Sequence, residues 1–536
     1  MLAAALAALA AVLAHASAGA QPLRLDEALR LALARNPDIA VARTGVEAAR
    51  GQQQQAQGQF DWNLYANMSY QKLITPLTES AAAAEGIAQT RVYTTGYQAG
   101  VTRQLRSGVL IGANLDTLGE EDRSAPPWLA QQNLSRVNLT LTLPLLRGRG
   151  ARAVGAAEEA ARLEVEARRY ALLDSAARTL YATLVAYWEY RTRIELEKVA
   201  ASSEERSISL LESTRKLVDA AERPPADLVL LRADQADKAA ARAGAALARI
   251  EARQALGRLL GLDAQAIAGL AEPAAMLPDI LPDAGSAPGA PAAVPGTGPA
   301  AMAAGALARR PDLRALALQG QAARRRLAGS SDLLKPRLDL DVGLTQARAG
   351  EGGGRYGMLR HPGRGQSSPS VFAKLNFAFP VGNNLAQGAV RIDAAEAARL
   401  EVEERDLGIA VATGVDSAWQ ALSTGAAQLR VAREGLALYE KAVNQEITKQ
   451  RNGIATLIDV INTESRFVSA RMNYLQIQLA YATALARLRL ETGTLVPALA
   501  ADGDSVAIEV GDIAGLGPLA APSLPSSPPA DARFRP

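Results

Sequence analysis

The chain has 536 residues, a formal net charge of only +3, two histidines and no cysteine. The near-neutral charge argues against nucleic-acid binding, and the lack of cysteine excludes disulfides and a lipid anchor on cysteine. One of the two histidines, His15, lies in the apolar N-terminal segment, so histidine-based catalysis and His/Cys metal sites are nearly excluded for the rest of the chain.

Residues 1–20 are predicted to be a secretory signal peptide. They form an Ala/Leu-rich run that ends in small residues, with cleavage expected after Ala20. No Lys or Arg precedes the apolar run, which leaves a buried N-terminal helix as the alternative. No later stretch of about 18 apolar residues follows, so we expect an exported chain without a transmembrane helix.

The next segment, from Leu25 to about Gln57, is predicted to be one helix. Its apolar residues recur at helical spacing, and Asp26 and Glu27 lie in the first turn, where the helix dipole favours acids. A similar helix is expected from about Ala303 to Leu334.

Four segments alternate apolar and polar residues with the period of a strand: 60–70, 137–143, 338–344 and 371–379. Strands of about ten residues with one apolar and one polar face suit a membrane barrel. A soluble antiparallel sheet with one solvated face is the alternative. The signal peptide and the aromatic residues near the strands favour the barrel.

Residues 97–105 and 109–115 also alternate, around a turn at Ser107-Gly108. We favour a hairpin outside the membrane here, and two additional barrel strands are the alternative. Arg103 counts against the second interpretation, because it would face lipid at a cost of about 2–4 kcal/mol at the midplane.

Long helices rich in Ala, Leu, Glu and Arg follow each set of strands. Proline and glycine mark a reversal within each region, since both residues break helices. The return arm and the opening helix, stacked end to end, match the long helix in length, which predicts an antiparallel coiled coil. The expected ranges are 151–221 and 226–261 in the first region, and 387–452 and 455–493 in the second.

The sequence is a duplication. Asn36-Pro37-Asp38 returns as Arg310-Pro311-Asp312, and Asp227 with Gly261 returns as Asp459 with Gly493 at the same separation. The predicted organisation is a signal peptide (1–20), repeat one (21–268), a Pro/Ala/Gly-rich linker (269–302), repeat two (303–498) and a disordered tail (499–536).

Three features of the sequence resemble the TolC-like outer-membrane efflux proteins. They are the duplicated helix starts, the segment Leu-Pro-Leu-Leu-Arg-Gly-Arg-Gly from Leu143 and the segment Gly-Ile-Ala-Thr-Leu-Ile-Asp-Val from Gly453. The resemblance covers roughly residues 22–497. It implies an α+β membrane protein: a trimeric outer-membrane β-barrel, usually with four strands per chain, that continues into a long periplasmic α-helical coiled-coil barrel. Six strands per chain would instead give eighteen in a trimer.

The resemblance also implies a passive exit duct in the outer membrane that docks on a periplasmic adaptor and an inner-membrane transporter. Drug, metal ion and secreted polypeptide stay open as cargo, and no cofactor is expected. An enzyme is disfavoured because His361 is the one candidate histidine base. A periplasmic coiled-coil adaptor without a barrel is the other alternative. Independently of the resemblance, an unclosed sheet edge in lipid is costly, so an oligomer must close the sheet.

By the same resemblance, Asp459 corresponds to an acidic position that rings the narrowest part of the pore. Three residues later this chain has Asn462 where well-known members carry a second acid. Asp227 is the repeat-one partner of Asp459. Both aspartates also fit helix-start carboxylates stabilised by the helix dipole, an interpretation that stays open.

The reversals are implied to be the adaptor-docking tips, formed by Arg223, Pro224, Pro225, Asn452, Gly453 and Ile454. Pro144 and Pro380 are expected to follow the last strand residue of each repeat. Because proline cannot donate to a strand ladder, we interpret both as structural hinges between barrel and helices.

Overall fold

The computed structural model describes residues 22–124, 131–221, 224–278, 298–351, 366–452 and 454–495. The predicted signal peptide, most of the linker, the tail, Arg223, His361 and Gly453 lie outside these ranges. The chain divides into two compact units that each draw on both repeats. The helical unit comprises Met1–Arg43, Ala171–Pro311 and Leu407–Pro536, and the sheet unit comprises Thr44–Tyr170 and Asp312–Asp406.

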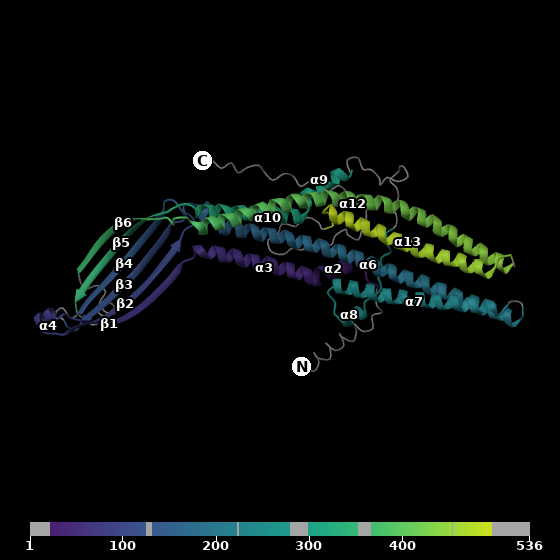
Figure 1. The fold of residues 1–536 in the computed structure, drawn as a ribbon, viewed down its shortest axis with the longest axis horizontal. Helices are drawn as coiled ribbons and strands as arrows, with labels where there is room; N and C mark the ends of the chain where they lie inside the picture. The colour runs from purple at the N-terminus through teal and green to yellow at the C-terminus, as the bar shows by residue number, and fades with distance from the viewer. Residues whose placement is uncertain are drawn as a thin grey trace, which may run out of the picture. The chain divides into compact units, whose positions relative to one another are not determined.

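The sheet unit contains one antiparallel sheet with the strand order β1-β2-β3-β4-β5-β6 (Figure 1). The preferred interpretation of residues 97–115, a hairpin outside the sheet, is therefore wrong. The two extra strands pair between the strands that flank them in sequence, as the alternative predicted. The strands are β1 (Asn63–Pro76), β2 (Gln89–Gln104), β3 (Leu110–Asp122), β4 (Gln131–Pro144), β5 (Arg337–Glu351) and β6 (Gln366–Ala378).

The register gives the sheet one apolar and one polar face. Because side chains of directly opposite residues share a face, an apolar row runs across all six strands. It consists of Leu64, Val101, Ala113, Leu139, Leu344 and Val371. A row on the opposite face is mostly polar and consists of Asn67, Gln98, Asp116, Arg136, Ala347 and Ser368.

Each opening helix is broken once, so the predicted single helices are wrong at this point. The breaks fall at Asn36 and Arg310, whose backbones are extended, with ψ of 130° and 127°. Both residues precede a proline, which disfavours the helical conformation of the residue before it and lacks an N–H. The resulting helices are α2 (Leu25–Arg35), α3 (Pro37–Gln57), α9 (Pro299–Arg309) and α10 (Pro311–Asp332).

The long helices have the predicted order. They are α6 (Ala156–Asp219), α7 (Ala226–Leu259), α12 (Asn384–Arg451) and α13 (Leu457–Glu491). The shorter elements are η1 (Gly58–Phe60), α4 (Glu79–Glu85), α5 (Ala151–Val154) and α8 (Ala264–Ala268). None of the described helices has a stretch apolar and long enough to cross a membrane.

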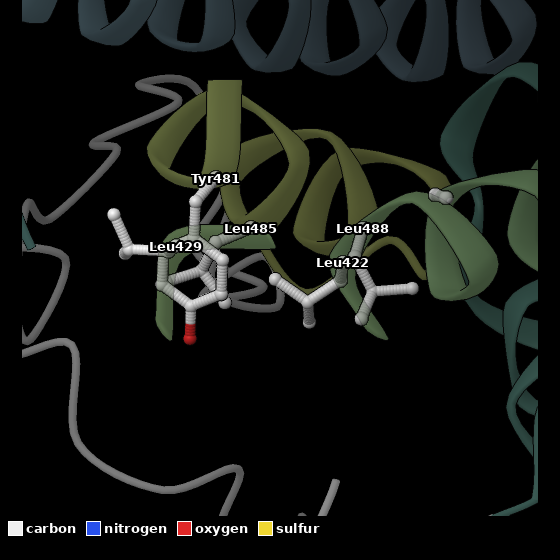
Figure 2. Close-up of a cluster of buried hydrophobic side chains, with 6 residues drawn as sticks. Leu422, Leu429, Tyr481, Leu485 and Leu488 are labelled. Atoms are coloured by element: carbon white, nitrogen blue, oxygen red, sulfur yellow. The ribbon is translucent and has the colours of Figure 1, made fainter. Parts of the chain in front are cut away.

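Leucine and tyrosine side chains form the core between α12 and α13 in the helical unit. Leu422 and Leu429 of α12 pack with Tyr481, Leu485 and Leu488 of α13 (Figure 2). These side chains are at most 9% exposed and recur at helical spacing. The apolar periodicity thus fixes which faces of the two helices meet.

Candidate functional site

The reversal between α12 and α13 ends in a capping box. Thr456 is the N-cap of α13, and its hydroxyl accepts a hydrogen bond from the Asp459 backbone N–H at 3.2 Å. In return, the Asp459 carboxylate accepts from the Thr456 backbone N–H at 3.0 Å and from its hydroxyl at 2.6 Å. The two residues thereby satisfy donors that a helix start would otherwise leave unpaired.

The Thr456 contacts favour the charged form of the Asp459 carboxylate. The Thr456 hydroxyl, then its backbone N–H and then the charge of Lys449 lower the pKa of Asp459 from its ordinary value of 3.8. Asp459 and Asn462 are both exposed. The helix-start interpretation of Asp459 is confirmed, and the carboxylate remains open to solvent while it caps the helix.

The reversal between α6 and α7 is built differently. The Asp227 backbone N–H donates to the Pro224 carbonyl at 3.1 Å, and Pro225 occupies the N-cap position, where it provides no side-chain cap. Asp227 is half-buried, whereas Pro224 and Pro225 are exposed. The duplicated aspartates therefore occupy matching helix starts with different local contacts.

The residues predicted at the tips are surface residues where the structure describes them. Asn452 is exposed, and Ile454, an apolar side chain, is 75% exposed at the end of the reversal. Exposed apolar side chains at a tight reversal do not contribute to the core of this chain. They are available to a partner.

A buried cluster centred on Glu464 was missed at the sequence level. Its carboxylate accepts from the Ser203 hydroxyl and the Arg206 Nε, both at 3.0 Å, and lies 3.8 Å from the Lys238 Nζ. The cluster joins α6, α7 and α13 within the helical unit. The sequence feature that could have revealed the burial of Glu464 is its position in an apolar stripe. Leu457, Val460, Glu464 and Val468 recur at helical spacing, and all four are buried.

The duplicated landmarks form a second set of contacts, where an opening helix meets a return helix. The Asn36 side chain donates to the Leu259 carbonyl at 2.9 Å and accepts from the Asp38 N–H at 2.9 Å. In repeat two, Arg310 donates to Glu491 at 2.6 Å. Each break in an opening helix thus supplies a side chain that holds the end of the return arm.

The two predicted hinge prolines lie at different points of the strand ends. Pro144 is still paired, opposite Asp339, and the Leu145 N–H donates to the Leu338 carbonyl at 2.8 Å. The expectation that Pro144 follows the last strand residue is therefore wrong, because one missing N–H does not stop a ladder whose next donor, the Leu145 N–H, is in place. β6 ends at Ala378, so Pro380 follows its strand as expected.

The polar face of the sheet carries charges of both signs. Arg136 lies 3.6 Å from Asp116, and the Thr142 hydroxyl donates to Asp341 at 2.6 Å. In the ranges that the structure describes, no group of three or more His, Cys, Asp or Glu side chains is arranged to hold a metal ion.

Residues 303–494 match the family described as "Outer membrane efflux protein". These residues therefore carry the sequence features of an outer membrane efflux protein domain. The match covers the second repeat and confirms the resemblance inferred from the sequence. The family is one of the outer membrane, in agreement with the predicted location. No curated protein matches the chain.

Solved structures of outer-membrane channels share the fold. The outer-membrane channel OprN is 18% identical, with a TM-score of 0.63 over 88% of this chain and 90% of that one. CmeC of Campylobacter jejuni is 14% identical, with a TM-score of 0.63 over 88% and 85%. VceC of Vibrio cholerae is 14% identical, with a TM-score of 0.63 over 88% and 96%. The predicted α+β fold class of these channels is confirmed.

Proposed function

We propose that the protein is the outer-membrane channel of a tripartite efflux or type I secretion system. It acts as a passive exit duct across the periplasm and outer membrane, driven by an inner-membrane transporter through a periplasmic adaptor. The chain works as a homotrimer, the assembly implied by the resemblance. No catalytic role is assigned to any residue.

The two-faced sheet is the observation that carries the proposal. Leu64 and Val371 in the apolar row are each 75% exposed, and Phe377 on the same face is 67% exposed. A soluble sheet would cover such a face, whereas a membrane barrel turns it toward lipid and its polar face toward water. The alternative of a periplasmic adaptor without a barrel would leave the apolar face in water.

The constriction is proposed at the start of α13. Asp459 is exposed and its pKa is lowered, so it presents a charged carboxylate at neutral pH. Three symmetry-related carboxylates repel one another, and a passing cation relieves the repulsion. Asn462 and the half-buried Asp227 are proposed to line the same region.

The reversals are proposed as the adaptor-docking surface. The exposed Ile454 supports this assignment, together with exposed Pro224, Pro225 and Asn452. Arg223 and Gly453 complete the predicted surface from outside the described residues.

The test begins with the purified protein in planar lipid bilayers, where we expect stepwise channel currents. A protein that stays monodisperse without detergent and gives no currents would contradict a channel. For docking, Ile454→Asp should abolish co-purification of the adaptor while the currents persist. Gln445→Asp, at an exposed position on α12, is the matched control and should leave docking unchanged.

A further inference from the structure

We propose that the sheet is one third of an eighteen-stranded barrel, closed by pairing β1 of each copy with β6 of the next. This inference rests on the proposed trimeric channel. It departs from the four strands per chain that the resemblance implies, because β2 and β3 of repeat one have no counterpart among the two strands of repeat two. Barrel diameter grows with strand number, so a barrel with six strands per chain is wider than one with four strands per chain.

The β2–β3 hairpin is a full part of the sheet. β2 pairs with β1 from Gln89 to Thr102, and β3 pairs with β4 from Leu110 to Glu121, each without a break in register. The apolar row passes through Val101 and Ala113 without interruption. A hairpin outside the membrane would not need to continue the apolar and polar faces of the sheet.

The turn of this hairpin is fixed to the end of the sheet where β4 leaves for the helices. The Gly150 N–H donates to the Ser107 carbonyl at 2.9 Å. Arg106 forms two hydrogen bonds to Glu158, at 2.9 and 2.7 Å, and its guanidinium lies 4.7 Å from the centre of the Phe60 ring. These contacts hold the turn of the hairpin against the end of the sheet.

Arg103, which counted against extra strands, is accommodated at this same end. Its Nε donates to the Phe60 carbonyl at 2.9 Å, and its guanidinium lies 5.4 Å from the Trp62 ring centre. Both partners precede β1, so Arg103 sits at the strand ends and not at the middle of the apolar face. The cost of a charge facing lipid falls to about 0–1 kcal/mol near an interface.

The strand ends are staggered as a closed barrel requires. The apolar row crosses β1 at Leu64, near its first residue, Asn63, and crosses β6 at Val371, well before its last residue, Ala378. The shift is roughly one residue per strand. The same ratio of shear to strand number occurs in the eight-stranded (β/α)₈ barrel, whose strands tilt by about 36°.

Both edge strands can pair with an edge strand of a second copy. Among the described residues β1 and β6 each pair with one strand, and both are almost wholly exposed. They have similar lengths of 14 and 13 residues and lie at the two edges of the sheet (Figure 1). Since every neighbouring pair in the order β1 to β6 is antiparallel, the two edge strands run in opposite directions, so an antiparallel pair between copies would continue the sheet. An open edge in lipid leaves backbone groups unpaired, and a head-to-tail contact of this kind closes a ring.

Matching the two faces restricts the register between copies. The apolar face carries the even-numbered residues of β1, such as Leu64, and the odd-numbered residues of β6, such as Val371, so each β1 residue must oppose a β6 residue of the other parity. If the stagger continues in the same direction from β6 of one copy to β1 of the next, Asn67 lies opposite Asn376. Lys374 is two residues away from Asn376 on the same face. All three lie on the polar face.

Disulfide mapping in the full-length chain tests the proposal, because the chain contains no cysteine of its own. Asn67→Cys with Gln98→Cys, an opposite pair within one copy, is the positive control. Asn67→Cys combined with Asn376→Cys or Lys374→Cys should give covalent dimers and trimers under non-reducing conditions. Asn67→Cys with Thr140→Cys should give no crosslink within a copy. Three strand spacings of about 4.8 Å separate β1 from β4, which is too far for a disulfide.

An internal crosslink in the Asn67→Cys/Thr140→Cys variant would show β1 pairing directly with β4 and would overturn the proposal. The absence of any β1–β6 crosslink between copies, with a reactive positive control, would also overturn it. Channel currents recorded from the same variants keep the two hypotheses apart. Currents together with a β1–β4 crosslink would leave the channel standing and refute the wider barrel.

Discussion

Glu464 of α13 accepts a hydrogen bond from the Ser203 hydroxyl of α6 at 3.0 Å, which joins residues from the two repeats. Glu464 is 8% exposed, and Arg206 of α6 and Lys238 of α7 supply the opposite charges. A buried carboxylate without such partners would be strongly unfavourable. The cluster therefore holds the return helix of repeat two against the hairpin of repeat one.

Replacing Glu464 with Ala should destabilise the protein, because Ser203 and Arg206 lose their shared acceptor and Lys238 loses its ion-pair partner. We expect a loss of about 1–3 kcal/mol, the range for a hydrogen bond to a charged group and for a buried group left unpaired. Thermal unfolding followed by circular dichroism in detergent measures it. Glu440→Ala, at an exposed position on α12, is the control, and equal effects of both changes would contradict the role of the cluster.

The two repeats offer a matched pair of glycines. Gly261 and Gly493 end the return helices with φ of +65° and +68°. A Cβ at Gly261 would lie 2.3 Å from the Arg35 carbonyl oxygen, whereas the nearest atom to a Cβ at Gly493 is 3.4 Å away. Ala at either site incurs left-handed strain of about 1–2 kcal/mol, and Gly261→Ala adds a backbone clash. Gly261→Ala should thus lower the melting temperature more than Gly493→Ala, and the reverse order would refute this account.

Two substitutions separate the capping and pore roles of Asp459. Asp459→Ala removes the carboxylate and the cap together, whereas Thr456→Ala breaks the capping box and keeps the charge. If Asp459 lines the constriction, Asp459→Ala should lose cation preference and block by multivalent cations in single-channel recordings, and Thr456→Ala should retain both. An unchanged preference in Asp459→Ala would remove Asp459 from the pore.

The lowered pKa of Asp459 predicts how its contribution to stability depends on pH. A carboxylate with a depressed pKa stabilises the folded state above the ordinary pKa of 3.8, and this contribution is lost as the pH falls through the lowered value. The melting temperatures of the wild type and Asp459→Ala should therefore differ at neutral pH and converge in acid. A difference that persists unchanged at low pH would mean that the charge is not what stabilises the start of α13.

The sequence predicted the individual strands but not how they pair. Alternation of apolar and polar residues shows that 97–105 and 109–115 are strands with two faces, and it does not identify their neighbours. In the sequence Arg103 counts against a strand that faces lipid, because nothing there shows its acceptor, the backbone carbonyl of Phe60, which lies 43 residues earlier. A contact of this kind has no trace in local periodicity.

The helices show the same limit. The apolar period runs through Asn36, so the sequence suggests one helix, although Pro37 marks the break. The two hydrogen-bond donors to Glu464, Arg206 and Ser203, lie 258 and 261 residues away. In the sequence, only the position of Glu464 in an apolar stripe indicates that it is buried. By contrast, the capping box could be read locally, because Thr456 and Asp459 have the spacing that a helix start requires.

The turn between β2 and β3 offers a further test of the sheet. Gly108 has φ of +95°, and a Cβ there would lie 1.9 Å from the Gly148 carbonyl oxygen and 3.0 Å from Pro144 Cγ. Gly148 also has a positive φ, of +77°, but a Cβ there would meet no atom within 4 Å. Both positions favour glycine by conformation, and only Gly108 does so by contact.

Gly108→Ala should push the hairpin turn away from the connection between β4 and α5, since a backbone oxygen cannot move aside cheaply. We expect fewer assembled trimers and a lower melting temperature than for Gly148→Ala, whose cost is backbone strain of about 1–2 kcal/mol alone. Trimer yield after extraction from membranes, measured by size-exclusion chromatography, provides the readout. If the hairpin were free of the sheet, its turn would not contact Gly148, and the two variants would behave alike.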